Sequence, residues 1–258
     1  MRSLRSYFQR LQLNPWSSRL YSSAFLVDAR NAPANFDPTS AVVYQDFLAA
    51  AEGEALIRDI SSRMHRYVQQ LRRLVWLTLA LCGTADQVLL RSFLRRRYEQ
   101  GHWDAVITDY KEVELGDEST LSTLSQQTLD KCREELRNRH LKPSAQFLPC
   151  HAIALRGQLK AHVDSIRFSG SMVAGISLLS SSIMRLVPAN NNGNKHWIDL
   201  CLPPLSLYVL TGMSRYDYSH ELLEGTATFQ HANTASVIHV QRDQRLSIIF
   251  RDMKGELE

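Results

Sequence analysis

The chain has 258 residues, 44% of them hydrophobic and 22% charged, and a formal net charge of +4. This composition excludes a disordered or fibrous chain and predicts one globular core with helical additions. The cysteines form no CxxC pair, which argues against a secreted disulfide framework, so we expect buried and inert thiols at Cys82, Cys132, Cys150 and Cys201.

The N-terminal segment has the composition of a mitochondrial transit peptide. Its first 27 residues include serines and no acidic residue, and their basic residues are Arg2, Arg5, Arg10 and Arg19. The run Arg19–Ser23 resembles a matrix processing site with the mature chain starting near Ser22, and a basic arm is the alternative interpretation. Removing four arginines would take the net charge from +4 to zero, so the overall basicity does not predict nucleic-acid binding.

Two segments show helical spacing of apolar residues. The first is Ala41–Arg66, preceded by N-cap candidates such as Asp37, and the second is Leu121–Leu141. Between them, the apolar run Leu74–Gly83 is much shorter than the roughly 18 to 20 residues that span a bilayer. We therefore expect a buried helix or an added hairpin there, and no transmembrane segment.

The charged residues on the two sides of this run favour different partners. Basic residues, with Arg95–Arg97 at their centre, allow contact with RNA or anionic lipid, although a solvated helix face has the same composition. The next stretch, Asp104–Ser119, contains six acidic residues against Lys111 alone. That surface would repel a phosphate backbone.

From about Phe147 the chain consists of short β-type runs separated by turn residues, including Asn190–Gly193 and Pro203-Pro204. Many closely spaced strands predict an all-β sandwich or barrel.

Candidate metal ligands lie in HVD and in RYDYSHE. Residues two apart in a strand share a face, so His162 and Asp164 would point into one cavity, and a long return connection can bring His220 to them. Two histidines and one carboxylate form the facial triad of non-haem Fe(II) oxygenases, which leaves positions open for a cosubstrate and dioxygen. A zinc or manganese cupin has similar ligands.

The strand RLSIIFR adds a candidate cosubstrate site. Arg245, Ser247, Ile249 and Arg251 would share one face, with apolar residues on the other. Guanidinium groups bind carboxylates in a bidentate manner and stay charged when buried, which suits 2-oxoglutarate.

These motifs also carry a family resemblance. HVDSIRFSG, SIMRLV, RYDYSHE and RLSIIFR, in this order and spacing, resemble the AlkB-type 2-oxoglutarate- and Fe(II)-dependent dioxygenases, most closely their mitochondrial AlkB homologue seven subfamily. The likeness covers about Arg95–Asp252, including RRRYEQGHWD. It implies a mainly β double-stranded β-helix (jelly roll) with flanking N-terminal helices. The expected regions are a transit peptide (1–21), a helical region with an insertion around Tyr67–Ser92 (22–94) and the dioxygenase domain (95–258).

The resemblance also implies roles for single residues. The implied Fe(II) ligands are His162, Asp164 and His220. The implied 2-oxoglutarate contacts are Tyr208, Arg245 and Arg251. Trp103 and Tyr216 are expected to be core aromatics, and His151 and His196 packing or surface histidines.

Two departures from the family bear on the substrate. The nucleic-acid demethylases carry Asn-x-Tyr before HxD, where this chain has His151-Ala152-Ile153, and they place long basic or aromatic hairpins over the iron, where this chain is short and acidic. These differences point away from duplex DNA and toward O2-dependent hydroxylation of a protein in the mitochondrial matrix. The subfamily implies a role in programmed necrosis and fatty-acid metabolism. An RNA demethylase for mitochondrial transcripts and a non-catalytic scaffold are the alternatives.

Overall fold

The structure, a computed structural model, describes residues 24–65, 99–102, 106–167, 169–190, 195–231 and 237–255. The expected transit peptide, the run Leu74–Gly83, Arg95–Arg97 and Trp103 lie outside these ranges. Within them, no helix combines the length and the apolar character needed to cross a membrane.

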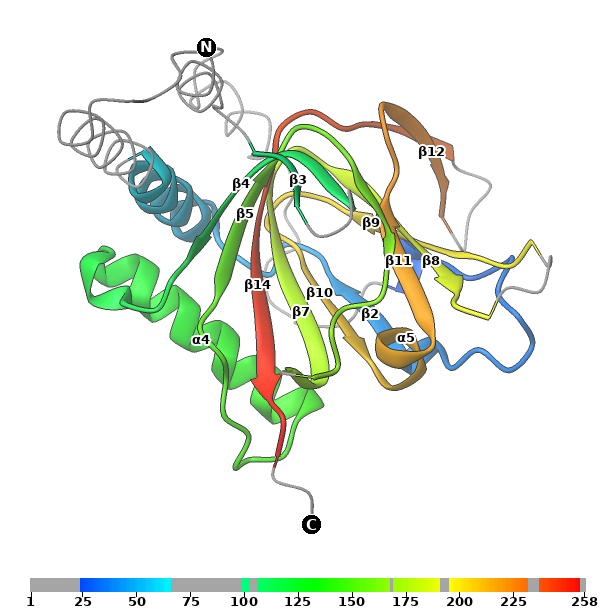
Figure 1. The fold of residues 1–258 in the computed structure, drawn as a ribbon, viewed down its shortest axis with the longest axis horizontal. Coiled ribbons are helices and arrows are strands. Elements are labelled where there is room, and N and C mark those ends of the chain that lie inside the picture. Colours follow the sequence, from blue (N-terminus) through cyan, green and yellow to red (C-terminus); the bar gives the residue numbers. More distant parts are fainter. Residues whose placement is uncertain are drawn as a thin grey trace, which may run out of the picture.

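The described chain is mainly β (Figure 1). Its first strands are β1 (Val27–Asp28), β2 (Ala41–Tyr44), β3 (Glu99–His102), β4 (Ile107–Glu114), β5 (His151–Leu155), β6 (Leu159–His162) and β7 (Ser169–Leu179). The remaining strands are β8 (Ser182–Pro188), β9 (Ile198–Leu202), β10 (Leu207–Thr211), β11 (Tyr218–Leu222), β12 (Thr226–Gln230), β13 (Val237–Gln241) and β14 (Arg245–Met253). The helices are η1 (Ala24–Leu26), η2 (Pro38–Ser40), residues 50–65, η3 (Glu118–Thr120), α4 (Thr123–His140) and α5 (Gly212–Tyr216).

The strands form one rolled antiparallel sheet. Its order is β1-β9-β8-β11-β6-β4-β5-β14-β7-β10-β2, with β3 added to β4 and a separate hairpin formed by β12 and β13. The end strands β1 and β2 lie close together, and β2 contributes to the same hydrophobic cluster as β9. The sheet therefore nearly closes on itself, which confirms the predicted jelly roll with flanking helices.

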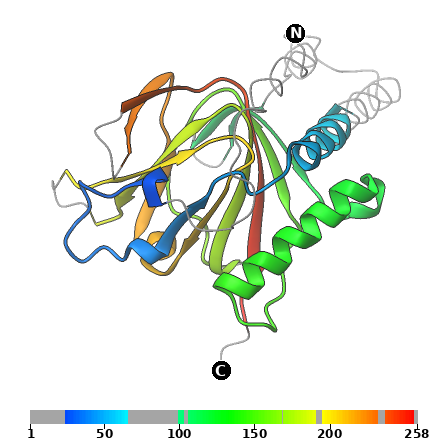
Figure 2. The same cartoon turned by 180° about the vertical axis from the view of Figure 1, so that it is seen from behind.

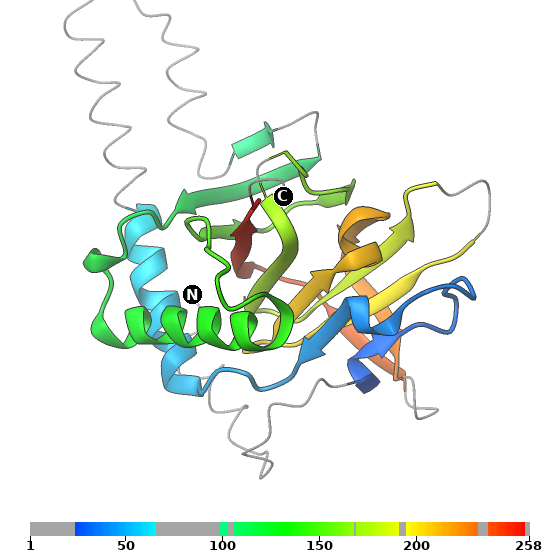
Figure 3. The same ribbon diagram turned by 90° about the horizontal axis from the view of Figure 1, so that it is seen from below.

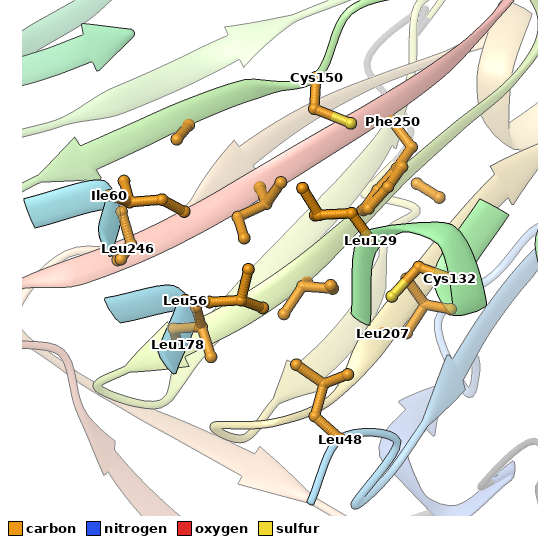
Figure 4. Packing of buried hydrophobic residues seen from close by; sticks show 14 of the residues in the cluster. Leu48, Leu56, Ile60, Leu129, Cys132, Cys150, Leu178, Leu207, Leu246 and Phe250 are labelled. Atoms are coloured by element: carbon orange, nitrogen blue, oxygen red, sulfur yellow. The ribbon is translucent and has the colours of Figure 1, made fainter. Parts of the chain in front are cut away.

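Alternation along β14 separates two apolar cores. Leu246, Ile248 and Phe250 belong to the cluster between the sheet and the helices, part of which is shown in Figure 4. Ile249 instead belongs to the cluster inside the barrel. Because neighbouring residues of a strand point to opposite faces, Arg245 shares the inner face with Ile249, as the sequence predicted.

Two helices cover the outer face of the sheet. In Figure 2, which views the molecule from behind, α4 lies in front of β14 and residues 50–65 lie beside it, and both helices are on the same side of the sheet when it is seen from below in Figure 3. The predicted helix Leu121–Leu141 is confirmed as α4, where the Ser122 side chain accepts a hydrogen bond from the Ser125 backbone N–H.

The predicted helix Ala41–Arg66 is wrong at its start. Ala41–Tyr44 is strand β2, paired with β10, and the helix begins only at residue 50. The reason lies in the β-branched Val42 and Val43, which favour a strand when a partner edge is available. The N-cap candidate Asp37 caps the short helix η2 instead.

The described cysteines, Cys132, Cys150 and Cys201, are free and buried, as expected. Burial raises the pKa of Cys150 to about 11 and that of Cys201 to about 12. Both side chains are therefore neutral thiols at physiological pH. Cys82 lies outside the described residues.

Replacing Leu129 by alanine tests the packing of α4 on the sheet. Leu129 is fully buried (0% exposed), so we expect Leu129→Ala to lower the free energy of unfolding by about 3 kcal/mol through lost burial and a cavity. Leu124→Ala on the same helix is the matched control, because Leu124 is 40% exposed. Urea unfolding measures both, and equal effects would contradict the packing described above.

Candidate metal and cosubstrate site

His162, Asp164 and His220 meet inside the barrel. Their candidate ligand atoms all lie within 4.8 Å of one another. The Nε2 atom of His162 is 3.5 Å from Oδ1 of Asp164, and the centroids of the two imidazole rings are 4.2 Å apart. Ligand atoms bound at about 2.1 Å to one ion can be up to roughly 4.2 Å apart, so small side-chain rotations would let all three reach a single metal.

Strand pairing brings the two histidines together. His162 ends β6 and stands opposite His220 of β11 in the register. The two histidines are separated by 57 residues in the sequence, and they meet because β11 also pairs with β8, which follows β7. Asp164 differs from the expectation of two ligands on one strand face, since β6 ends at His162 and Asp164 lies in the following loop.

The electrostatics favour metal binding at His220 and Asp164, whereas at His162, although burial acts to lower the pKa, the hydrogen bond with Asp164 raises it. Burial lowers the pKa of His220 to about 4, so its imidazole is neutral and its lone pair is free at neutral pH. Burial by itself would raise the pKa of Asp164, but the hydrogen bond with His162 and the charge of Arg251 hold that pKa well below its usual range. Asp164 is therefore anionic at neutral pH.

Arg245 and Tyr208 form a polar pair deep in the barrel. Tyr208 is 3% exposed and Arg245 is also 3% exposed, and the two side chains are hydrogen-bonded. Burial lowers the pKa of Arg245 from its ordinary value. Within the described part of the chain, Nε and Nη2 of Arg245 have no hydrogen-bond partner. Buried donors of this kind fit the carboxylate of a bound ligand.

Arg251 connects this pair to the triad. Its Nη2 atom is 3.6 Å from Oδ2 of Asp164, and its side chain is 26% exposed. Arg251 stands on the same face of β14 as Arg245, which is six residues earlier. The sequence-predicted site residues Tyr208, Arg245 and Arg251 are thus in one interior with the triad.

Other predicted positions lie differently. Tyr216 is 45% exposed, so its prediction as a core aromatic is wrong; its hydroxyl donates to the Gly170 carbonyl because α5 ends at the rim of the barrel. His151 is half-buried and pairs with Glu112, with 2.7 Å between Nδ1 and Oε1. His196 is a surface histidine whose Nδ1 is 3.1 Å from the Asn31 carbonyl oxygen.

Two residues near the site were not identified from the sequence. Gly175 lies directly under the Tyr208 ring, so that an added Cβ would come within 2.5 Å of Cε1 of Tyr208. Arg215 is 2% exposed and donates from Nη1 to the Asp164 carbonyl at 2.9 Å. Arg215 is the first residue of RYDYSHE, but neither its role nor that of Gly175 could be identified from the motif or its neighbours, because both residues act through contacts with strands or loops distant in the sequence.

Comparison with known proteins places the chain in a family. No family model matches it. It is 36% identical over 216 residues to "Alpha-ketoglutarate-dependent dioxygenase alkB homolog 7, mitochondrial" of Mus musculus, covering 83% of this chain and 78% of that protein. The protein of the same name from Bos taurus is 34% identical over 83% of this chain and 79% of its own length. Among solved structures, a Pseudomonas putida prolyl-4-hydroxylase is similar with a TM-score of 0.47 and 13% identity, over 84% of this chain and 94% of that one. The chain belongs to the alkB homolog 7 family of alpha-ketoglutarate-dependent dioxygenases.

Proposed function

We propose that this protein is a mitochondrial matrix dioxygenase that hydroxylates a protein substrate, with Fe(II) held by His162, Asp164 and His220. The observation that carries the proposal is the pairing of this triad with the buried, partly unpartnered Arg245 guanidinium in one interior. A metal site without a cosubstrate would not need a buried cation nearby, since burying a charge is costly unless it is paired.

The donor set fits the implied cofactors. Two imidazoles and one carboxylate would hold Fe(II) and leave positions for a chelating keto acid and dioxygen. Nε and Nη2 of Arg245, assisted by the Tyr208 hydroxyl, are placed to bind the far carboxylate of 2-oxoglutarate. Arg251, beside Asp164, would orient the triad carboxylate and the near end of the cosubstrate.

Fe(II) with bound 2-oxoglutarate supplies an oxidant for a substrate C–H bond, using O2 and releasing succinate and CO2. The residues of the chain supply geometry and charge. His162 is oriented by the hydrogen bond between its Nδ1 and the Lys160 carbonyl, at 2.9 Å, which directs Nε2 toward Asp164. The buried Arg245 end of the site excludes water, so that only the rim is left for the substrate.

The surroundings of the site support a protein substrate. Val163 and Ile166, which flank Asp164, are 37% and 56% exposed, and Tyr216 lies beside the same loop through its contact with Gly170. Exposed apolar side chains next to a reactive centre suit peptide side chains better than a sugar–phosphate backbone. On β4, the carboxylates of Glu112 and Glu114 would repel phosphate.

Matrix localisation rests on the transit-like first 21 residues together with relatives that are named mitochondrial. The role in programmed necrosis and fatty-acid metabolism is part of the proposal through family membership alone. The Arg95–Arg97 cluster, on which the RNA alternative depends, lies outside the described residues.

Turnover of the cosubstrate tests the reaction. We expect the iron-loaded chain starting at Ser22 to release succinate from 2-oxoglutarate, and His162→Ala to abolish this release because two ligands hold iron weakly. A matrix protein fraction should stimulate the rate, whereas mitochondrial RNA should not. Stimulation by RNA alone would overturn the protein-substrate proposal. Absence of turnover by a folded, iron-loaded chain with either fraction would favour the scaffold interpretation.

Replacing Arg245 by alanine separates the two binding functions. Hydrogen bonds to charged groups contribute about 1.5 to 3 kcal/mol, so Arg245→Ala should weaken 2-oxoglutarate binding by at least roughly tenfold. Metal affinity should stay within about twofold, since no triad ligand is removed. Calorimetry with Mn(II) and 2-oxoglutarate measures both constants. Arg185→Ala is the control, because the Arg185 guanidinium donates to the Asp199 carboxylate and has no part in the proposed site. Equal losses of metal and cosubstrate would refute the assignment.

The contact between Gly175 and Tyr208 allows a third test. A Cβ at position 175 would displace the tyrosine ring, so Gly175→Ala should weaken 2-oxoglutarate binding several-fold with metal affinity retained. Tyr208→Phe should have a similar effect, and the double variant should be no worse than the stronger single one, because both changes remove the same hydroxyl contact. Additive losses in the calorimetric titration would show that Gly175 acts by another route.

A further inference from the structure

Arg215 makes several hydrogen bonds that have no direct part in the proposed reaction. It lies in α5, the short helix between β10, which carries Tyr208, and β11, which carries His220. Its side chain is buried, and its guanidinium donates to three acceptors in one loop. Nη1 donates to the Asp164 carbonyl at 2.9 Å, and Nη2 donates to the Ser165 carbonyl at 3.0 Å and to Ser169 Oγ at 2.6 Å.

The loop that receives these contacts lies between two strands. β6 ends at His162 and β7 begins at Ser169, so Asp164 has no ladder hydrogen bonds of its own. Ser169 Oγ also donates to the Ser165 carbonyl at 2.8 Å, and the Arg167 backbone N–H donates to Ser165 Oγ at 3.3 Å. The Asp164 carboxylate itself faces His162 and Arg251. A guanidinium fork across two successive carbonyls fixes the direction of that backbone.

We propose that Arg215 is a positioning residue that holds the Asp164 loop in its metal-binding conformation and ties it to the strand bearing His220. The inference rests on the proposed function, since it takes Asp164 as an iron ligand. Arg215 touches neither cosubstrate nor metal. It acts through the backbone of Asp164, and α5 itself is anchored by Ser214 Oγ, 2.6 Å from Ser40 Oγ.

The expected effect follows from the population of the competent loop. If the loop is free to leave this conformation, the apparent affinity for metal falls by the fraction of chains in which the Asp164 carboxylate is in place. Without the hydrogen bonds from the Arg215 guanidinium, we expect the fraction of chains with the Asp164 carboxylate in place to be a tenth or less. Apparent metal affinity would then fall about tenfold or more, although all three ligands are still present.

The test uses Co(II) as a spectroscopic probe of the full chain starting at Ser22. We compare wild type, Arg215→Met and Arg215→Lys, and measure both the Co(II) dissociation constant and the visible ligand-field spectrum. In Arg215→Met we expect at least tenfold weaker binding and an altered spectrum. Arg215→Lys keeps the buried charge but offers one donor group in place of the fork, and it should lie between Arg215→Met and wild type. Hydrogen exchange of the metal-free protein should show faster exchange in residues 163–169 of both variants.

Arg185→Met is the matched control. Arg185 also holds a two-pronged contact, to Asp199 at 2.8 and 2.7 Å, on the neighbouring strand β8. Losing that contact should lower thermal stability without changing the Co(II) constant or the spectrum. A merely structural Arg215 would behave in the same way, so a folded Arg215 variant with wild-type affinity, spectrum and loop exchange overturns the inference. If Arg215→Met does not fold, Arg215→Lys decides by the same criteria.

The same experiment separates the two proposals. Wild type should bind one Co(II) per chain and His162→Ala should lose it; failure of this pair contradicts the proposed metal site. Success of this pair with unchanged Arg215 variants contradicts only the role of Arg215.

Discussion

The Arg245 guanidinium is buried in the barrel, and the residues around it must accommodate a charge that is removed from water. A cation in a low-dielectric interior is tolerated only with polar partners, and among the described residues Tyr208 is the one that hydrogen-bonds to it. Two further donor atoms are left for a ligand. Tyr208 in turn can lie there because position 175 has no side chain. The interior therefore holds buried donors that suit a carboxylate.

The alternation of β14 allows one strand to serve two purposes. Its outward residues, including Phe250, pack under the helices and supply the apolar burial that stabilises the sheet. Its inward residues carry Arg245 and Arg251 into the barrel. Residues 50–65 and α4 pack on the outer face of the sheet, and this packing supports the strand that carries both arginines.

Prediction from the sequence succeeded where chemistry and periodicity were local. HVD, RYDYSHE and RLSIIFR each carry functional residue types at strand spacing, and the structure brings them into one interior. It failed where a distant partner decided the outcome. Ala41–Tyr44 is a strand because β10 offers an edge, and Tyr216 is exposed because α5 ends at the rim. Neither partner can be recognised within a short window of sequence.

The sequence alone indicated the candidate ligand types, the arginine spacing and the mainly β architecture, because residue chemistry and strand periodicity are properties of neighbouring positions. Only the tertiary structure decided that Asp164 leaves the strand, that Arg215 holds its backbone and that Gly175 makes room for Tyr208. These contacts join residues some 30 to 50 positions apart, and their existence depends on the register and curvature of the closed sheet, which no local pattern encodes.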